Sequence, residues 1–175
     1  MPDSYCGAPC YTLHLMTRNA PPARTFFVGV FLFLLAAVCA VAPIPILYRS
    51  LGILLASYMA FAFAGMPFAY ATALLTPAIG LVGGSTAWLV MLPIILSSSL
   101  LAMLGLEFSW RYAAVIVSPA LYVIPQVIVW QLSQRRLFSV ELPWEPTPTV
   151  WLSVHGLTAL VGVLGALYLD RRSKR

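Results

Sequence analysis

Three polar side chains recur at one spacing in the apolar segment from residue 112 to residue 131. Ser118, Tyr122 and Gln126 stand four residues apart, so on an α-helix they lie on one face. A fourth polar residue, His155, stands inside the apolar segment 150–169. Polar groups are costly to bury in a bilayer and often mark functional sites. We predict that these four residues bind a ligand; the alternative is that they hydrogen-bond between helices and only fix the packing.

The acidic residues do not favour catalysis. General acid–base or nucleophilic catalysis needs paired carboxylates, or a nucleophile beside a base. Every carboxylate stands at the end of an apolar segment or in a connection: Asp3, Glu107, Glu141, Glu145 and Asp170. The sequence also has no P-loop, no HExxH motif and no CxxCH haem motif. We therefore expect no enzymatic activity and no cofactor.

The N-terminal stretch "CGAPCYTLH" has ligand-type residues at positions 6, 10 and 14. On a helix, Cys6, Cys10 and His14 would form one stripe, but Gly7 and Pro9 disfavour a helix. A closed tetrahedral zinc site also needs a fourth ligand, so we expect no metal. Residue 16 begins "MTRNAPPARTFF", a short basic start before an apolar segment. Residues 1–15 would then come from an upstream start codon and be absent or disordered in the cell.

Composition determines the class of protein. Hydrophobic residues make up 61% of the 175 residues and charged residues 9%, whereas a soluble domain carries about 25% charged residues. The sequence predicts an all-α, polytopic transmembrane helical bundle, because its apolar runs are continuous rather than alternating as in a membrane β-barrel. The net charge of +5 arises from residues that flank these runs. We expect the bilayer, not nucleic acid, to be the partner of this charge.

A helix that crosses the membrane needs about 20 residues. The stretch from Leu51 to Leu106 contains no charged residue or histidine, and a turn at Gly65–Pro67 divides its first part into two short crossings. One crossing plus a re-entrant segment is the alternative, which would give five spans. The six spans that we predict, between tails at 1–24 and 170–175, are 25–48, 51–66, 68–83, 86–105, 112–131 and 150–169. The first span also resembles a signal peptide, but its apolar run continues beyond the cleavage site expected before Pro43, which favours an uncleaved span.

The distribution of basic residues favours six spans. With an even number, the two termini share one side with the connection that holds Glu107 and Arg111. That side collects seven basic residues: Arg18, Arg24, Arg111, Arg171, Arg172, Lys174 and Arg175. The other side holds Arg49, Arg135 and Arg136. Because cytoplasmic loops carry the excess of basic residues, we predict that both termini are cytoplasmic, and short loops favour a bacterial inner membrane.

The stretch "LFSVELPWEPTPT", residues 137–149, is the longest connection after the first span. Trp144 stands there between two prolines, with Glu141 and Glu145 nearby. This composition suits a stiff segment at the level of the lipid headgroups. It is either a plain connector or a lid over a central cavity.

Small residues recur at four-residue intervals and allow helices to approach closely. We predict that they form faces for helix packing or for docking of a partner protein. These positions are Ala36, Ala40, Gly52, Ala56, Ala60, Ala64 and Gly162.

In size, six-span topology and the Ala36-x-x-x-Ala40 pattern, the chain resembles the S-components of energy-coupling-factor vitamin transporters. That resemblance implies that Ala36 and Ala40 dock on a coupling subunit and that other subunits hydrolyse ATP. In size and topology the chain also resembles the cell-shape family typified by the rod-complex membrane subunit. Two functions are therefore expected: a membrane subunit that binds a small uncharged solute, or a non-catalytic scaffold that binds other membrane proteins.

Overall fold

The computed structural model describes residues 22–83, 85–109, 112–135, 137, 142–144 and 146–173. These residues form six α-helices and one short 3₁₀-helix. The elements in chain order are α1 (Pro22–Val41), α2 (Ile46–Ala64), α3 (Met66–Ile79), η1 (Gly80–Gly83), α4 (Thr86–Phe108), α5 (Ala114–Gln134) and α6 (Pro148–Ser173). Cys6, Cys10, His14 and the tail of residues 1–15 lie outside the described residues.

The prediction of an all-α bundle with six spans is confirmed. Six helices are long and apolar enough to cross a membrane, and the third of these spans, Met66–Gly83, joins α3 to η1. The turn between α2 and α3 is made at Gly65, whose φ of 91° is a conformation that glycine adopts readily. The segment after this turn, Met66–Gly83, is helical and long enough to cross a membrane. The chain is therefore a multi-pass membrane protein.

The first helix is shorter than the sequence predicted. It ends at Val41, and α2 begins at Ile46. Pro43 and Pro45 account for this early end, because proline lacks an N–H donor and disfavours helical conformation in the preceding residue. As a result Arg49, expected between two spans, lies in the first turn of α2.

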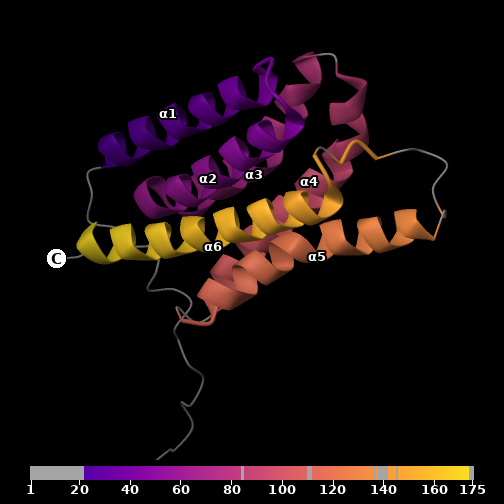
Figure 1. The fold of residues 1–175 in the computed structure, drawn as a ribbon. Helices are drawn as coiled ribbons and strands as arrows, with labels where there is room; N and C mark the ends of the chain where they lie inside the picture. The colour runs from indigo at the N-terminus through magenta and orange to yellow at the C-terminus, as the bar shows by residue number, and fades with distance from the viewer. Residues whose placement is uncertain are drawn as a thin grey trace, which may run out of the picture.

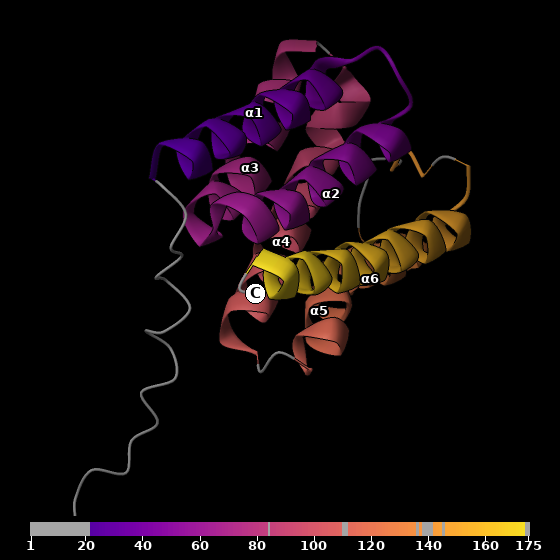
Figure 2. The ribbon, with the colours of Figure 1, turned by 90° about the vertical axis from the view of Figure 1, so that its left-hand side faces the viewer.

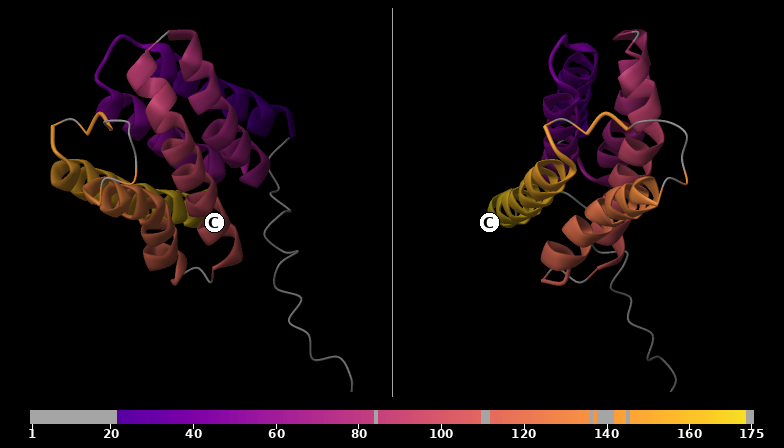
Figure 3. Two further views of the ribbon diagram at one scale, coloured as in Figure 1. Left: turned by 90° about the vertical axis from the view of Figure 1, so that its right-hand side faces the viewer. Right: turned by 45° about the vertical axis from the view of Figure 1, so that its right-hand side comes forward.

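The second helix lies at the centre of the bundle. It packs against α1, α3 and α6, while α4 packs against α3 and α5. Helix α1 packs against α2, α3 and the 3₁₀-helix η1, and α5 lies against α4 and α6. Figures 2 and 3 show the consequence: α1 and α5 occupy opposite outer sides of the bundle.

Two buried clusters fill the bundle, one towards each end. One includes Leu54, Tyr58, Met103 and Val163. The other includes Leu47, Trp88 and Trp151, from the first turns of α2, α4 and α6, together with Ala40 from the last turn of α1. The α1–α2 connection, η1 and residues 142–144 of the α5–α6 linker all lie at this second end, on the right in Figure 1. We call it the linker end; α1 begins and α6 ends at the opposite end.

The helix faces formed by small residues are buried inside the bundle. Helix α1 contributes Ala36 and Ala40, and α2 contributes Ala56, Ala60 and Ala64; all five are buried. Their neighbours are helices of the same chain. Docking of a partner through these residues would therefore require the helices to separate.

The two glycines predicted with them stand at close helix contacts. An added Cβ at Gly52 would meet Cys39 Sγ at 3.2 Å, and one at Gly162 would meet Tyr58 Cδ2 at 2.4 Å. The absence of a side chain thus allows α2 to approach α1 and α6 to approach α2.

Candidate functional site

The polar stripe of α5 points into the bundle. Ser118, Tyr122 and Gln126 are all buried, as their spacing of four residues on one helical face requires. Pro119 and Pro125 lie within the same helix. His155, the fourth ligand-binding candidate, is also buried, on α6.

Ser118 joins three helices. Its hydroxyl lies 2.8 Å from the carbonyl oxygen of Ala102 on α4 and 2.9 Å from the hydroxyl of Tyr58 on α2. A serine hydroxyl has one hydrogen, so Ser118 donates to Ala102 and accepts from Tyr58. The helices are close enough for this because Gly105 has no side chain; a Cβ there would lie 3.1 Å from Ser118 Cα. Both hydrogen bonds of Ser118 therefore join helices of the bundle.

Gln126 also joins three helices. Its Oε1 accepts a hydrogen bond of 3.0 Å from Trp151 Nε1 on α6. Its Nε2 donates over longer distances, 3.4 Å to Ser98 Oγ on α4 and 3.3 Å to the carbonyl oxygen of Tyr122. The amide is thus firmly held at its oxygen and loosely held at its nitrogen.

The imidazole of His155 is fixed on both of its nitrogens. Nδ1 lies 2.9 Å from the carbonyl oxygen of Trp151, one turn earlier on α6, and Nε2 lies 2.8 Å from Ser50 Oγ on α2. A carbonyl oxygen only accepts, so Nδ1 carries a hydrogen. In the neutral imidazole the lone pair is then on Nε2 and faces Ser50.

Aromatic rings enclose this imidazole. The Trp151 ring stacks on it with centroids 4.5 Å apart, and the Tyr122 ring stacks with centroids 5.8 Å apart. Stacked rings hold each other in place by contact over a large area. Trp144 of the linker then lies edge-on to Trp151 at 5.8 Å, so the linker contributes to the site.

The hydroxyl of Tyr122 has no hydrogen-bond partner within the described part of the chain, although the residue is 0% exposed. An unsatisfied buried polar group costs about 1–3 kcal/mol. Buried hydroxyls in proteins nearly always have a partner, which is often a water molecule or a ligand. The Tyr122 ring stacks on His155, and the polar side chains nearest its hydroxyl include Gln126 and Tyr58.

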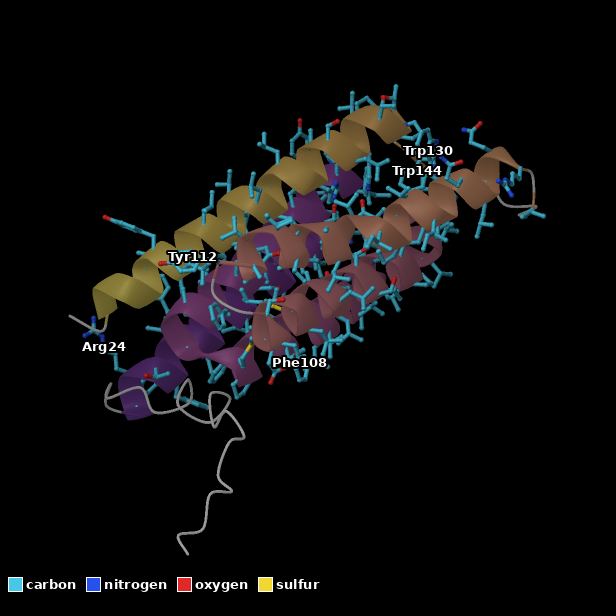
Figure 4. The ribbon with its side chains drawn as sticks, turned by 90° about the horizontal axis from the view of Figure 1, so that it is seen from below. Arg24, Phe108, Tyr112, Trp130 and Trp144 are labelled. Atoms are coloured by element: carbon cyan, nitrogen blue, oxygen red, sulfur yellow. The ribbon has the colours of Figure 1, made fainter. Side chains whose placement is uncertain are left out.

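Two further indole donors at the linker end lack partners among the described residues, those of Trp130 and Trp144. Figure 4 shows both side chains at the same end of the bundle, opposite Arg24. Leu142 and Trp144 of the linker pack against the buried cluster of that end. The segment 142–144 thus covers the site, which is consistent both with a plain connector and with a lid.

Arg49 closes the linker end from the other side. It is only 4% exposed, and its guanidinium group lies 4.1 Å from the centroid of the Trp88 ring. Its Nη2 donates to the carbonyl oxygens of Ala40 and, at 3.1 Å, Gly80. Ala40 lies in the last turn of α1 and Gly80 directly follows α3, so both carbonyls stand at C-terminal helix ends, which attract a cation.

The four ligand-binding candidates predicted from the sequence are Ser118, Tyr122, Gln126 and His155. Four further residues of the site were not predicted: Arg49, Ser50, Trp88 and Trp151. The structure joins His155 and Gln126 through Trp151 and stacks Tyr122 on His155, whereas Ser118 lies apart, bonded to Tyr58. Arg49 had a signal in the sequence: it is the charged residue directly before a long uncharged stretch. Ser50 had none, because serine is common in membrane helices.

The site is uncharged apart from Arg49 at its edge. Among the described residues, no three side chains of His, Cys, Asp or Glu lie close enough together to hold a metal ion. Glu107 accepts a hydrogen bond from Tyr70 towards the opposite end, where α3 begins and α4 ends. Chemically, the site offers neutral hydrogen-bond donors and acceptors, aromatic surface and one hydroxyl–imidazole pair. Comparisons with protein-family models, with curated proteins and with solved structures found no match.

Proposed function

We propose that this protein is the membrane subunit of a transport system and binds a small uncharged solute at the linker end. The observation that carries the proposal is the hydroxyl of Tyr122, which is fully buried and without a partner in the described chain. A bound solute would supply the missing hydrogen bond.

The surroundings of this hydroxyl support a solute of a particular kind. The groups near the Tyr122 side chain are the amide of Gln126, the imidazole of His155 and the hydroxyl of Tyr58, none of which is permanently charged. A solute with a hydrogen-bonding oxygen or nitrogen and an apolar body would suit them, since ligand sites combine apolar walls with a few placed polar groups. A charged solute would lose its hydration without an ion pair in return.

The orientation that we propose places the linker end outside the cell. With both termini cytoplasmic in a bacterial inner membrane, the α1–α2 connection, η1 and the α5–α6 linker face the exterior. A solute would then be captured from outside beneath the linker. Energy for its release would come from other membrane subunits, since the sequence has no nucleotide-binding motif.

The test is native mass spectrometry of the protein in lipid nanodiscs, searching for a small molecule retained at one per chain. The Tyr122→Phe variant removes only the orphaned hydroxyl, so we expect it to retain at least tenfold less solute, which corresponds to the loss of one hydrogen bond of about 1.4 kcal/mol. Tyr48→Phe is the matched control, because Tyr48 is exposed on α2. Equal retention by all three proteins, or none by any, would overturn the proposal.

A scaffold that binds other membrane proteins is the second candidate, and the outer face of α1 favours it. Phe27, Phe31 and Val38 are 64–70% exposed there, spaced as a row along one helix face. Lipid would cover this row equally well. Phe31→Ala with Val38→Ala should release a partner captured by crosslinking in membranes if the row is an interface, and should leave the crosslinks unchanged if it faces lipid.

A further inference from the structure

We propose that Ser50 is a nucleophile activated by His155, and that the pair transfers the acyl group of an uncharged carboxylic ester. This inference goes beyond the proposed function, with which it shares the hydroxyl of Tyr122 and the imidazole of His155. It departs from the expectation that the chain has no enzymatic activity, because the structure brings together a nucleophile and a base from segments 105 residues apart.

The first argument is the geometry of the pair. Ser50 Oγ lies 2.8 Å from His155 Nε2, and His155 Nδ1 lies 2.9 Å from the carbonyl oxygen of Trp151. A nucleophile, a base within hydrogen-bond distance and a third group that orients the base are the features of an activated serine. The stacked rings of Trp151 and Tyr122 hold the imidazole in this orientation.

The second argument is the position of the hydroxyl hydrogen. Ser50 Oγ also lies 2.8 Å from the carbonyl oxygen of Leu47 and 3.0 Å from that of Ile46, but a hydroxyl donates only one hydrogen. With Nδ1 already donating to Trp151, the neutral imidazole can only accept at Nε2, so Ser50 donates to it. The imidazole is thereby placed to take the proton of Ser50.

Another buried serine of α2 provides an internal comparison. Ser57 donates to the carbonyl oxygen of Ile53 at 2.8 Å, the ordinary bond of a serine to the preceding turn of its helix. Ser50 and Ser57 are buried to the same extent, 1% exposed each. Ser50 differs in facing an imidazole.

The third argument is the Tyr122 hydroxyl. Attack on an ester produces negative charge on the former carbonyl oxygen, which a preorganised donor stabilises. The Tyr122 ring stacks on the imidazole, and its buried hydroxyl is not engaged by the described residues. We assign it as the donor to this oxygen.

The reaction balances with water as the only second reactant. Ser50 Oγ bonds to the ester carbonyl carbon, and its proton passes to His155 Nε2. The bond from that carbon to the alkoxy oxygen then breaks, and the departing alcohol takes the proton from Nε2. Water attacks the acyl-serine with His155 again accepting a proton, which releases the carboxylic acid and returns Ser50 to its hydroxyl form.

The substrate class follows from the location. The pair lies within α2 and α6 near the linker end, among uncharged and aromatic side chains, so a permanently charged ester would be excluded. Because Ser50 and His155 are buried between α2 and α6, these helices must move apart for entry of the ester. A small, uncharged ester that partitions into the membrane is therefore expected.

The test uses phenylmethylsulfonyl fluoride, a small uncharged reagent for activated serines, on the full chain in nanodiscs. We expect one adduct by intact mass, mapped to Ser50. Ser50→Ala should abolish it, His155→Gln should slow it by about 100-fold or more, and Ser57→Ala should react as the wild type does. Tyr122→Phe should slow hydrolysis of p-nitrophenyl acetate by about 100-fold.

Access is tested separately with Ser50→Cys in a background without other cysteines, treated with an uncharged methanethiosulfonate reagent. Failure of this thiol to react would overturn the inference, because no ester could reach the position. Reaction of the thiol without a sulfonyl adduct on wild-type Ser50 would overturn it as well. Retention of a solute by wild-type protein that forms no adduct would leave the proposed function standing alone.

Discussion

The guanidinium group of Arg49 lies 4.1 Å from the centroid of the Trp88 ring, and both side chains donate to backbone carbonyls at the C-terminal end of α3. Arg49 reaches Gly80, and Trp88 Nε1 donates to the carbonyl oxygen of Pro77 at 2.9 Å. The end of α3 is thus satisfied by side chains of the helices on either side of it. Because Arg49 also donates to Ala40, this pair fastens α1, α2, α3 and α4 together.

We expect Arg49→Gln to lower the free energy of unfolding by about 2–3 kcal/mol, since it removes a cation–π contact and charged hydrogen bonds. Arg49→Lys keeps the charge but lacks the planar fork, so its loss should be intermediate. Reversible unfolding in mixed micelles measures both. Arg135→Gln is the control, because Arg135 is an exposed arginine near the same end. A stability of Arg49→Gln equal to that of this control would contradict the role given to Arg49.

Gly162→Ala should lower stability by about 1–3 kcal/mol through overpacking. The new Cβ would lie 2.4 Å from Cδ2 of the Tyr58 ring, which is itself fully buried. Gly165→Ala is a matched control less than one turn away on α6, where a Cβ meets nothing within 4 Å. That variant should be neutral or slightly stabilising, because alanine favours a helix over glycine. Thermal unfolding in detergent compares the two; equal melting temperatures would refute the close contact of α6 with α2.

The number of spans could be predicted from the sequence because it depends on the solvent and on element length. Continuous apolar runs of membrane-spanning length, and a turn signal at Gly65, are local properties of the chain. The predicted end of α1 was too late, because the apolar run continues through Pro43 and Pro45. The helix ends before these prolines although the hydropathy does not change.

For the site, the sequence could predict which residues share a face of one helix, but not which residues of different helices meet. The spacing of Tyr122 and Gln126 is a property of α5 alone, and it correctly gave two buried polar groups on one face. The partner of His155 could not be found in this way, because Ser50 is brought to it by the packing of α2 against α6. Arg49 was interpreted as a flanking charge, since its two carbonyl acceptors and the Trp88 ring come from three other segments.

Both ends of the chain should lie on the cytoplasmic side. We expect fluorescent protein fused before Pro22 and after Ser173 to be active in the cytoplasm, and alkaline phosphatase at either position to be inactive. A cysteine placed at Thr147, exposed in the α5–α6 linker, should react with a membrane-impermeant maleimide from outside the cell. Activity of the two fusions on opposite sides would contradict an even number of spans, and labelling of Thr147→Cys only after permeabilisation would reverse the orientation.

Two tyrosine-to-phenylalanine changes should shift stability in opposite directions in protein stripped of small molecules. Tyr58→Phe removes the donor to Ser118 and should cost about 1 kcal/mol. Tyr122→Phe removes an unsatisfied hydroxyl and should raise the free energy of unfolding, because the desolvation cost of that group disappears. Adding a solute that binds at Tyr122 should stabilise the wild type by mass action and leave Tyr122→Phe nearly unchanged. The wild type should then be the more stable of these two proteins, whereas without solute Tyr122→Phe should be. Unfolding measured with and without solute checks this, and a loss of stability in stripped Tyr122→Phe as large as that in Tyr58→Phe would mean that the Tyr122 hydroxyl is already bonded within the chain.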